Sequence, residues 1–292
     1  MRNLKSNLLQ LIRRTSAELP DDVVQAIQRG ATQEAKDTNA SYAMNIIQKN
    51  IDLAKLKAAP LCQDTGSILF FVKAPRGFDQ MAFEKAASEA VAEATAKGYL
   101  RQNSVDSITG KNTGNNLGPG SPSLHFHQHR GTRVDVRLVL KGGGCENVGA
   151  QYSLPEVRLQ ANRDMNGVRK VILDAVIQAQ GKGCGPGILG VCIGGDRATG
   201  YLHSKEQLLR SLDDTNPNPA LAALEKDIVA TANKLGIGPM GFGGATTLLG
   251  CKIGSLNRLP ASFFVSISYM CWAYRRRGFV LNEAGKIVEW LY

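Results

Sequence analysis

The segment Cys62-Gln63-Asp64-Thr65-Gly66, followed by the apolar run at residues 68–72, is the most informative stretch of this chain. The apolar run predicts a buried strand, so the loop before it places a thiol, an amide and a carboxylate at the edge of a core. Two more cysteines, Cys184 and Cys271, lie far along the chain among small residues. We interpret these three thiols, each at a loop or a strand end, as candidate ligands of a metal centre.

The composition is typical of a globular protein that works in a reducing compartment. With 292 residues, the chain can bury a sizeable core as one domain or as two closely packed lobes. No apolar run in the sequence approaches the length needed to cross a bilayer. Residues 1–14 have helical spacing and no cleavage pattern, so we expect an amphipathic first helix rather than a transit peptide. Six cysteines without a signal-peptide pattern predict reduced thiols and a cytoplasmic location.

The net charge of +10 fits an anionic substrate, an acidic protein partner or nucleic acid. Its densest part is Arg275-Arg276-Arg277, which we expect on a solvated surface or on a patch that faces a partner. Aromatic residues make up only 6% of the chain, and no nucleic-acid-reading motif is evident. These features argue against nucleic acid as the partner.

Hydrophobic spacing predicts helices and strands without regular alternation, which favours an α+β fold over a doubly wound sheet. Helices are expected from residue 21 and over residues 41–56, 83–96, 155–180 and 219–235. Strands are expected over residues 68–72, 133–140, 188–193, 246–253 and 262–269, with shorter ones near residues 280–281 and 287–288. We treat residues 1–292 as a single domain that could consist of two packed lobes.

Two further patterns were weighed as sites. The glycine-rich segments at residues 141–144 and 181–187 lack the Walker and dinucleotide spacings, but their backbone N–H groups could hold a carboxylate. Structural turns explain them equally well. His125, His127 and His129 occupy alternate positions, which would place three imidazoles on one face of a strand. Because no carboxylate lies in that segment, we favour a solvent-facing strand over a metal site.

Several segments in combination resemble class I fumarate hydratases and the α subunit of L(+)-tartrate dehydratase. The resemblance starts at residues 60–66 and continues, in the family's order, through residues 99–103, 112–114, 141–144, 235–239 and 271–276. It covers nearly the whole chain. The chain is similar in length to the α part alone, so we expect the β-type domain to be absent from it.

The resemblance implies an iron–sulfur hydro-lyase. In that family three cysteines hold a 4Fe-4S cluster whose fourth iron has no protein ligand, and the matching positions are Cys62, Cys184 and Cys271. Cys145 is expected near the site but without a bond to the cluster. Cys192 and Cys251 lie in apolar strand patterns and are expected in the core.

The resemblance also implies reversible addition or removal of water on a small hydroxy diacid, either fumarate/malate or tartrate. Gln63, Asp64, Arg101 and the backbone of Gly144 match substrate-contacting positions, and Asp64 and Arg101 match catalytic ones. The family's catalytic base lies in the β part. A β subunit is therefore the expected partner, in a hetero-oligomer of α and β chains.

One position departs from the family. Leu259 stands where fumarases and the tartrate enzyme have a histidine, twelve residues before the last cluster cysteine. This change bears on the substrate more than on the cluster. Together with the basic charge, it leaves an alternative: a non-catalytic binding or regulatory protein on a degenerate hydro-lyase scaffold.

Overall fold

The computed structural model describes residues 3–292, which form two compact units. Unit 1 comprises the described part of Met1–Asp21, together with Lys49–Gly143 and Ala273–Tyr292; unit 2 comprises Asp22–Gln48 and Gly144–Trp272. Each unit combines helices with a mixed sheet, which confirms the α+β class. Among the described helices, none is both long and apolar enough to span a membrane.

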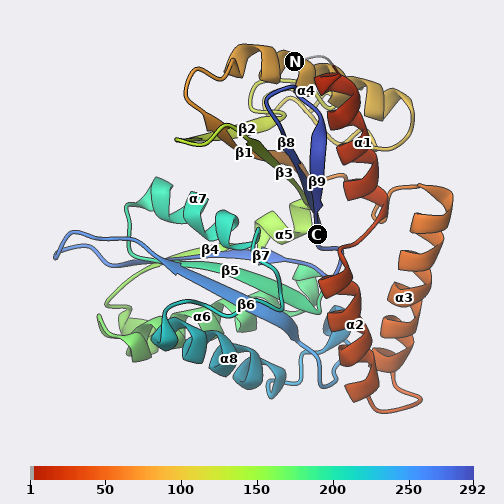
Figure 1. Cartoon of the computed structure of the whole chain (residues 1–292). Coiled ribbons are helices and arrows are strands. Elements are labelled where there is room, and N and C mark those ends of the chain that lie inside the picture. Colours follow the sequence, from red (N-terminus) through yellow and green to blue (C-terminus); the bar gives the residue numbers. More distant parts are fainter. Residues whose placement is uncertain (1–2) are drawn as a thin grey trace. The chain divides into compact units, whose positions relative to one another are not determined.

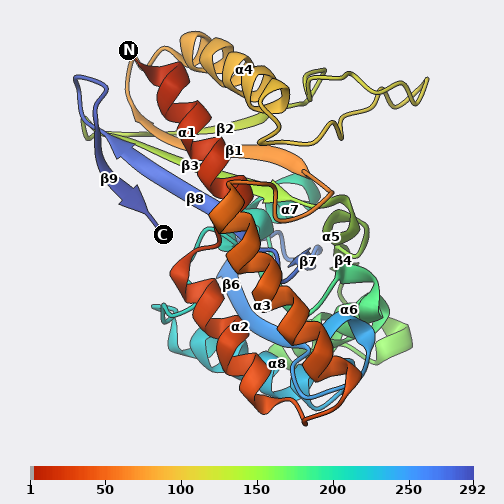
Figure 2. The same cartoon turned by 90° about the vertical axis from the view of Figure 1, so that its right-hand side faces the viewer.

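Unit 1 is a five-stranded sheet with two helices, α1 and α4, on one face (Figures 1 and 2). The strand order is β2-β1-β3-β8-β9, with β1 and β2 parallel and the other neighbours antiparallel. Side chains alternate along β1, so Phe70 packs against Phe83 of α4 in the core. The elements are α1 Leu4–Ala17, β1 Ser67–Pro75, α4 Gln80–Ala96, β2 Ser123–His129, β3 Val134–Lys141, β8 Arg275–Leu281 and β9 Ile287–Leu291.

The cationic run at the start of β8 is buried, so the expectation of a solvated or partner-facing patch is wrong. Arg275 and Arg276 are 0% exposed and Arg277 is 6% exposed. The guanidinium carbon of Arg276 lies 4.3 Å from the ring centre of Tyr274 and 4.6 Å from that of Tyr292. Arg277 donates a hydrogen bond to the carbonyl oxygen of Tyr292. Aromatic faces and backbone carbonyls thus replace water around these cations.

Unit 2 is built on a four-stranded sheet of order β4-β7-β5-β6, in which β5 and β6 are parallel. Helices α6 and α8 cover one face of this sheet, and α7 covers the other (Figure 1). Gly190 of β5 allows the close approach of α7, because a Cβ there would collide with the carbonyl oxygen of Ser204. The elements are β4 Ala150–Ser153, α6 Met165–Ala179, β5 Gly187–Ile193, α7 Arg197–Gln207, α8 Pro219–Asn233, β6 Leu248–Ser255 and β7 Phe264–Met270.

The remaining helices are α2 (Asp21–Gln33), α3 (Asn39–Lys57) and the short α5 (Gly143–Asn147). Most predicted elements are confirmed with shifted ends. The first expected helix is α1, and residues 1–2 of that prediction lie outside the described part of the chain.

The helix expected over residues 155–180 is wrong in its first ten residues, since α6 begins at Met165. The residues before it form a short 3-10 turn that ends at Gln160, whose φ is +49°. The carboxylate of Asp164 then caps α6 by accepting the amide N–H of Gly167 at 2.7 Å. Strand β4 and helix α7 had not been expected at all.

Candidate functional site

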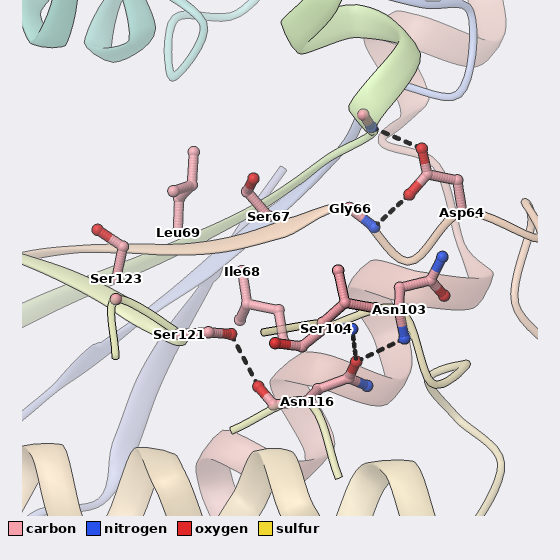
Figure 3. A pocket seen from close by; sticks show the side chains of 13 residues that line it. Asp64, Gly66, Ser67, Ile68, Leu69, Asn103, Ser104, Asn116, Ser121 and Ser123 are labelled. Carbon is pink, nitrogen blue, oxygen red and sulfur yellow. Dashed lines mark hydrogen bonds between the residues drawn. The ribbon is translucent and has the colours of Figure 1, made fainter. Parts of the chain in front are cut away.

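The loop at residues 62–66 lies directly before β1 in unit 1, as expected from the sequence. The two carboxylate oxygens of Asp64 each accept a backbone N–H: Oδ1 from Gly66 at 2.8 Å and Oδ2 from Gly143 at 2.6 Å (Figure 3). The amide of Asp64 donates to the sulfur of Cys62 at 3.4 Å. Gly66 has φ +78°, and a Cβ there would collide with the backbone of Lys141. The loop is therefore held in one conformation by its own backbone and by that of residues 141–143.

Thr65 joins this loop to Arg101. Its hydroxyl accepts the amide N–H of Arg101 at 2.8 Å and donates to the carbonyl oxygen of Arg101 at 3.0 Å. Thr65 is 1% exposed, whereas the side chains of Gln63 and Arg101 are exposed. The structure thus brings Gln63, Asp64 and Arg101 together within unit 1 through a threonine that no sequence motif marks as a site residue.

A second anchor of the Arg101 segment is the buried side chain of Asn116. Its Oδ1 accepts the amide N–H groups of Asn103 at 2.8 Å and of Ser104 at 3.1 Å (Figure 3). Its Nδ2 donates to the carbonyl oxygen of Arg101 at 2.7 Å and to the hydroxyl of Thr95 at 3.0 Å. One amide group therefore fixes the whole turn after Arg101.

We expect Asn116→Ala to lower the free energy of unfolding by about 1–3 kcal/mol, because buried backbone donors and acceptors lose their partner. Substrate affinity should fall as well, because the backbone of Arg101 loses one of its two anchors. Chemical denaturation and steady-state kinetics would measure the two effects. The control is Asn115→Ala, since the exposed Asn115 side chain accepts the amide N–H of Leu117. Equal effects of the two substitutions would contradict this role for Asn116.

A cavity of about 360 Å³ lies beside Asp64 and is lined by residues of unit 1 (Figure 3). Its wall is mainly polar at the loops and apolar along β1, where Ile68 and Leu69 contribute. The polar lining comes from Asp64, Ser67, Asn103, Ser104, Asn116, Ser121 and Ser123. The space suits a small polar molecule.

Three cysteines come together in unit 2. The sulfur of Cys145, in α5, accepts the amide N–H of Cys271 at 3.2 Å, and the carbonyl oxygen of Cys184 accepts the amide of Trp272 at 3.3 Å. Burial raises the pKa of Tyr269, and the charges of Cys271, Cys145 and Cys184 raise it further. The three cysteines therefore lie near Tyr269.

Local chain geometry explains how Cys184 and Cys271 reach this place. Cys184 ends the 3-10 turn Gln180–Gly183 with a φ of +54°, and Cys271 directly follows β7. A Cβ at Gly183 or Gly187 would collide with the ring of Tyr269, so only glycine on both sides lets the turn pack there. Both cysteines thus end regular elements, as the sequence indicated.

The predicted site residues are distributed over both units. Cys62 belongs to unit 1 and Cys184 and Cys271 to unit 2, so a three-cysteine centre remains a prediction. Gly144 belongs to unit 2, where a Cβ on it would lie 3.7 Å from the carbonyl oxygen of Lys182. Leu259 is 74% exposed, in the loop between β6 and β7.

Two cysteines are confirmed as core residues. Cys192 and Cys251, in β5 and β6, are 0% and 3% exposed. Burial raises the pKa of Cys192 to about 12 and also raises that of Cys251. At neutral pH both are protonated thiols, which neither bind metal nor react readily.

The histidines of β2 have structural contacts. His125 stacks on Phe71 with ring centres 5.0 Å apart, and His129 bridges the carbonyl oxygen of Arg133 and the amide of Gly131. Within residues 3–292, no group of three or more His, Cys, Asp or Glu side chains is arranged to hold a single metal ion. These contacts favour the structural interpretation of the histidines.

Comparisons with known proteins show to which family this chain belongs. The sequence profile described as fumarate hydratase (Fumerase) matches residues 5–280. A Geobacillus stearothermophilus protein named "Putative fumarate hydratase class I" is 51% identical over the whole chain, which spans 58% of that protein's length. The L(+)-tartrate dehydratase subunit alpha of Escherichia coli K12 is 33% identical over 89% of this chain and 85% of its own length. A Methanocaldococcus jannaschii protein named as such an alpha subunit is 31% identical over 92% of this chain and 94% of its own length. The chain therefore belongs to the fumarate hydratase (Fumerase) family.

Proposed function

We propose that this chain is the α part of an iron–sulfur hydro-lyase that reversibly adds or removes water on a small hydroxy diacid. The observation that carries the proposal is the tie between Asp64 and Arg101 through the buried hydroxyl of Thr65. A carboxylate and an exposed guanidinium on one fixed backbone suit a ligand with both a hydroxyl and a carboxylate. The names of the relatives make fumarate/malate and tartrate the candidate substrates.

We assign the cluster to Cys62, Cys184 and Cys271. Thiols are the donors that a 4Fe-4S cluster needs, and each binds a separate iron, unlike the ligands of a single ion. The N–H···S bond from Asp64 to Cys62 supports this assignment, since such bonds stabilise a thiolate. When bound, the cluster would supply a Lewis-acid iron that makes the substrate hydroxyl a better leaving group.

The residues of the chain have separate roles in this proposal. Arg101 binds a substrate carboxylate through its planar fork of N–H groups. Gln63 and the backbone N–H of Gly144 contact the substrate and fix its orientation. Asp64 orients the hydroxyl that leaves, because its two oxygens are themselves held by the amides of Gly66 and Gly143.

A second chain completes the site in this proposal. Relatives of similar extent are named alpha subunits, so we infer a β subunit that carries the base for the adjacent carbon. We also propose a cytoplasmic location, where thiols stay reduced. The alternative of a basic, non-catalytic binding protein loses its main support, because the densest cationic run is buried in β8.

The test is anaerobic co-expression of this chain with a β-type partner chain, followed by reconstitution with iron and sulfide. We expect about four irons per α chain, broad visible absorption, and turnover of fumarate, malate or one tartrate enantiomer. The separate α chain should bind the cluster but show no turnover. A reconstituted pair that converts none of these acids, or an α chain active by itself, would overturn the proposal.

A further inference from the structure

The side chain of Arg275, the first residue of β8, carries hydrogen-bond donors that nothing in its surroundings accepts. The residue is 0% exposed. Its Nη1 donates to the carbonyl oxygen of Asp64 at 2.8 Å. Its Nε and Nη2 have no hydrogen-bond partner among residues 3–292. A buried cation with two unsatisfied donors is costly, and in native proteins such a group requires an explanation, such as a catalytic role or a bound ligand.

The two unsatisfied atoms lie on the same edge of the guanidinium plane. This is the edge that forms two parallel N–H···O bonds with a carboxylate, whereas the Nη1 corner already binds the Asp64 loop. Arg277, two residues along the strand, donates instead to the carbonyl oxygens of Leu19 and Tyr292 and pairs with Glu18 at 3.6 Å. Nε of Arg277 also lacks a partner among residues 3–292, but its Nη2 is bonded, so within this pair only Arg275 has both atoms of the Nε–Nη2 edge open.

Nη2 of Arg275, at that edge, and the carboxylate of Asp64 both lie close to Gly142. A Cβ placed on Gly142 would lie 3.1 Å from Oδ2 of Asp64 and 3.8 Å from Nη2 of Arg275. Glycine at position 142 thus lets Oδ2 of Asp64 and Nη2 of Arg275 approach the same point of the backbone, all within unit 1. Both Asp64 oxygens already accept backbone N–H groups, which offset part of its negative charge.

We propose that Arg275 binds one carboxylate of the hydroxy diacid through its Nε–Nη2 edge. The adjacent hydroxyl of the same acid would then lie toward Oδ2 of Asp64, as a 2-hydroxy carboxylate requires. Arg101, which is exposed, is left for the second carboxylate. This inference rests on the proposed function, but it concerns binding rather than turnover. Arg275 also positions the Asp64 loop through its Nη1 bond.

The experiment measures the affinity of succinate, a dicarboxylate without the hydroxyl that would leave, for the cluster-loaded chain by titration calorimetry. In Arg275→Lys the charge stays but the fork is lost, so we expect succinate to bind about 30-fold more weakly or worse. Butyrate, with one carboxylate, should bind weakly to both proteins. Arg277→Lys is the matched control and should keep the parent affinity, with iron content and unfolding midpoint compared throughout.

A second variant covers the case in which Arg275→Lys does not fold. Gly142→Ala leaves both charges in place and adds a methyl group 3.1 Å from Oδ2 of Asp64 and 3.8 Å from Nη2 of Arg275, so succinate binding should again weaken. No succinate binding to the parent chain, or unchanged affinity in both variants, would overturn the inference. Loss of iron with unchanged succinate affinity would also overturn it and would place the Arg275 edge against the cluster.

Turnover separates this inference from the proposed function. Normal conversion of the diacid by Arg275→Lys in the αβ pair would refute the carboxylate site and leave the hydro-lyase intact. Arg275-dependent succinate binding in a pair that converts no hydroxy diacid would support the carboxylate site and refute the hydro-lyase.

Discussion

Replacement of Cys184 or Cys271 by serine is expected to abolish both the iron–sulfur cluster and all turnover. A serine hydroxyl stays protonated at neutral pH and does not replace a thiolate as a ligand of iron. Iron content should fall from about four per chain to a background level, together with the visible absorption. Cys62→Ser should behave in the same way. Iron analysis and anaerobic absorption spectra measure this directly, without the β subunit.

The matched control for these variants is Cys145→Ser. The serine hydroxyl can still accept the amide N–H of Cys271, which the sulfur of Cys145 accepts at 3.2 Å. The cluster should therefore remain, because Cys145 is not among the assigned ligands. Cys192→Ala, in the core of unit 2, should also keep the cluster and lose only some stability. Loss of the cluster from Cys145→Ser, with retention in Cys184→Ser, would reassign the ligands.

Local signals in the sequence predicted much of the fold. The apolar runs of β1 and β5 and the spacing in α3 and α8 each follow from a periodicity within one segment. The α6 error has a similar cause. Apolar spacing continued smoothly into the residues before α6, and the cap at Asp164 had been overlooked.

The burial of Arg275–Arg277 could not be predicted in this way. Three consecutive arginines are typical of a surface, and apart from Tyr274 their partners lie in other segments of the sequence. Leu138 of β3 pairs with Arg277, and the guanidinium of Arg276 contacts Tyr292, which follows the antiparallel strand β9. Such a site depends on strand register, which no single segment encodes.

In the candidate site, too, some features follow from local sequence and others depend on tertiary contacts. Cys62, Asp64 and Arg101 were predicted from short motifs, but the groups that hold them were not. Thr65 is an ordinary threonine in the sequence, and its role depends on contact with a residue 36 positions away. Asn116, likewise, gave only a loop signal. Sequence motifs predicted candidate site residues, whereas the contacts that anchor them arise from tertiary packing.

Substitution of Asp64 by asparagine should reduce kcat by about 10²–10⁴-fold with a smaller change in KM. The amide has one acceptor oxygen, so it can accept the N–H of Gly66 or of Gly143 but not both, and it carries no charge. The charge and the orienting contact of Asp64 stabilise the transition state more than the bound substrate. Their loss therefore lowers kcat more than it weakens substrate binding. The measurement is steady-state turnover of the αβ pair, normalised to iron content.

Asp79→Asn provides the matched control for Asp64→Asn. Asp79 is an exposed carboxylate of unit 1 that caps α4 by accepting the amide N–H of Ala82 at 2.9 Å. Asparagine caps helices about as well as aspartate, so neither stability nor turnover should change. If Asp64→Asn kept kcat within a few-fold of the parent while its cluster content stayed normal, Asp64 would have no role in orienting the leaving hydroxyl. The leaving hydroxyl would then have to be oriented by the exposed Arg101 and the second subunit. Thr65 could not do so, because its hydroxyl bonds to the backbone of Arg101.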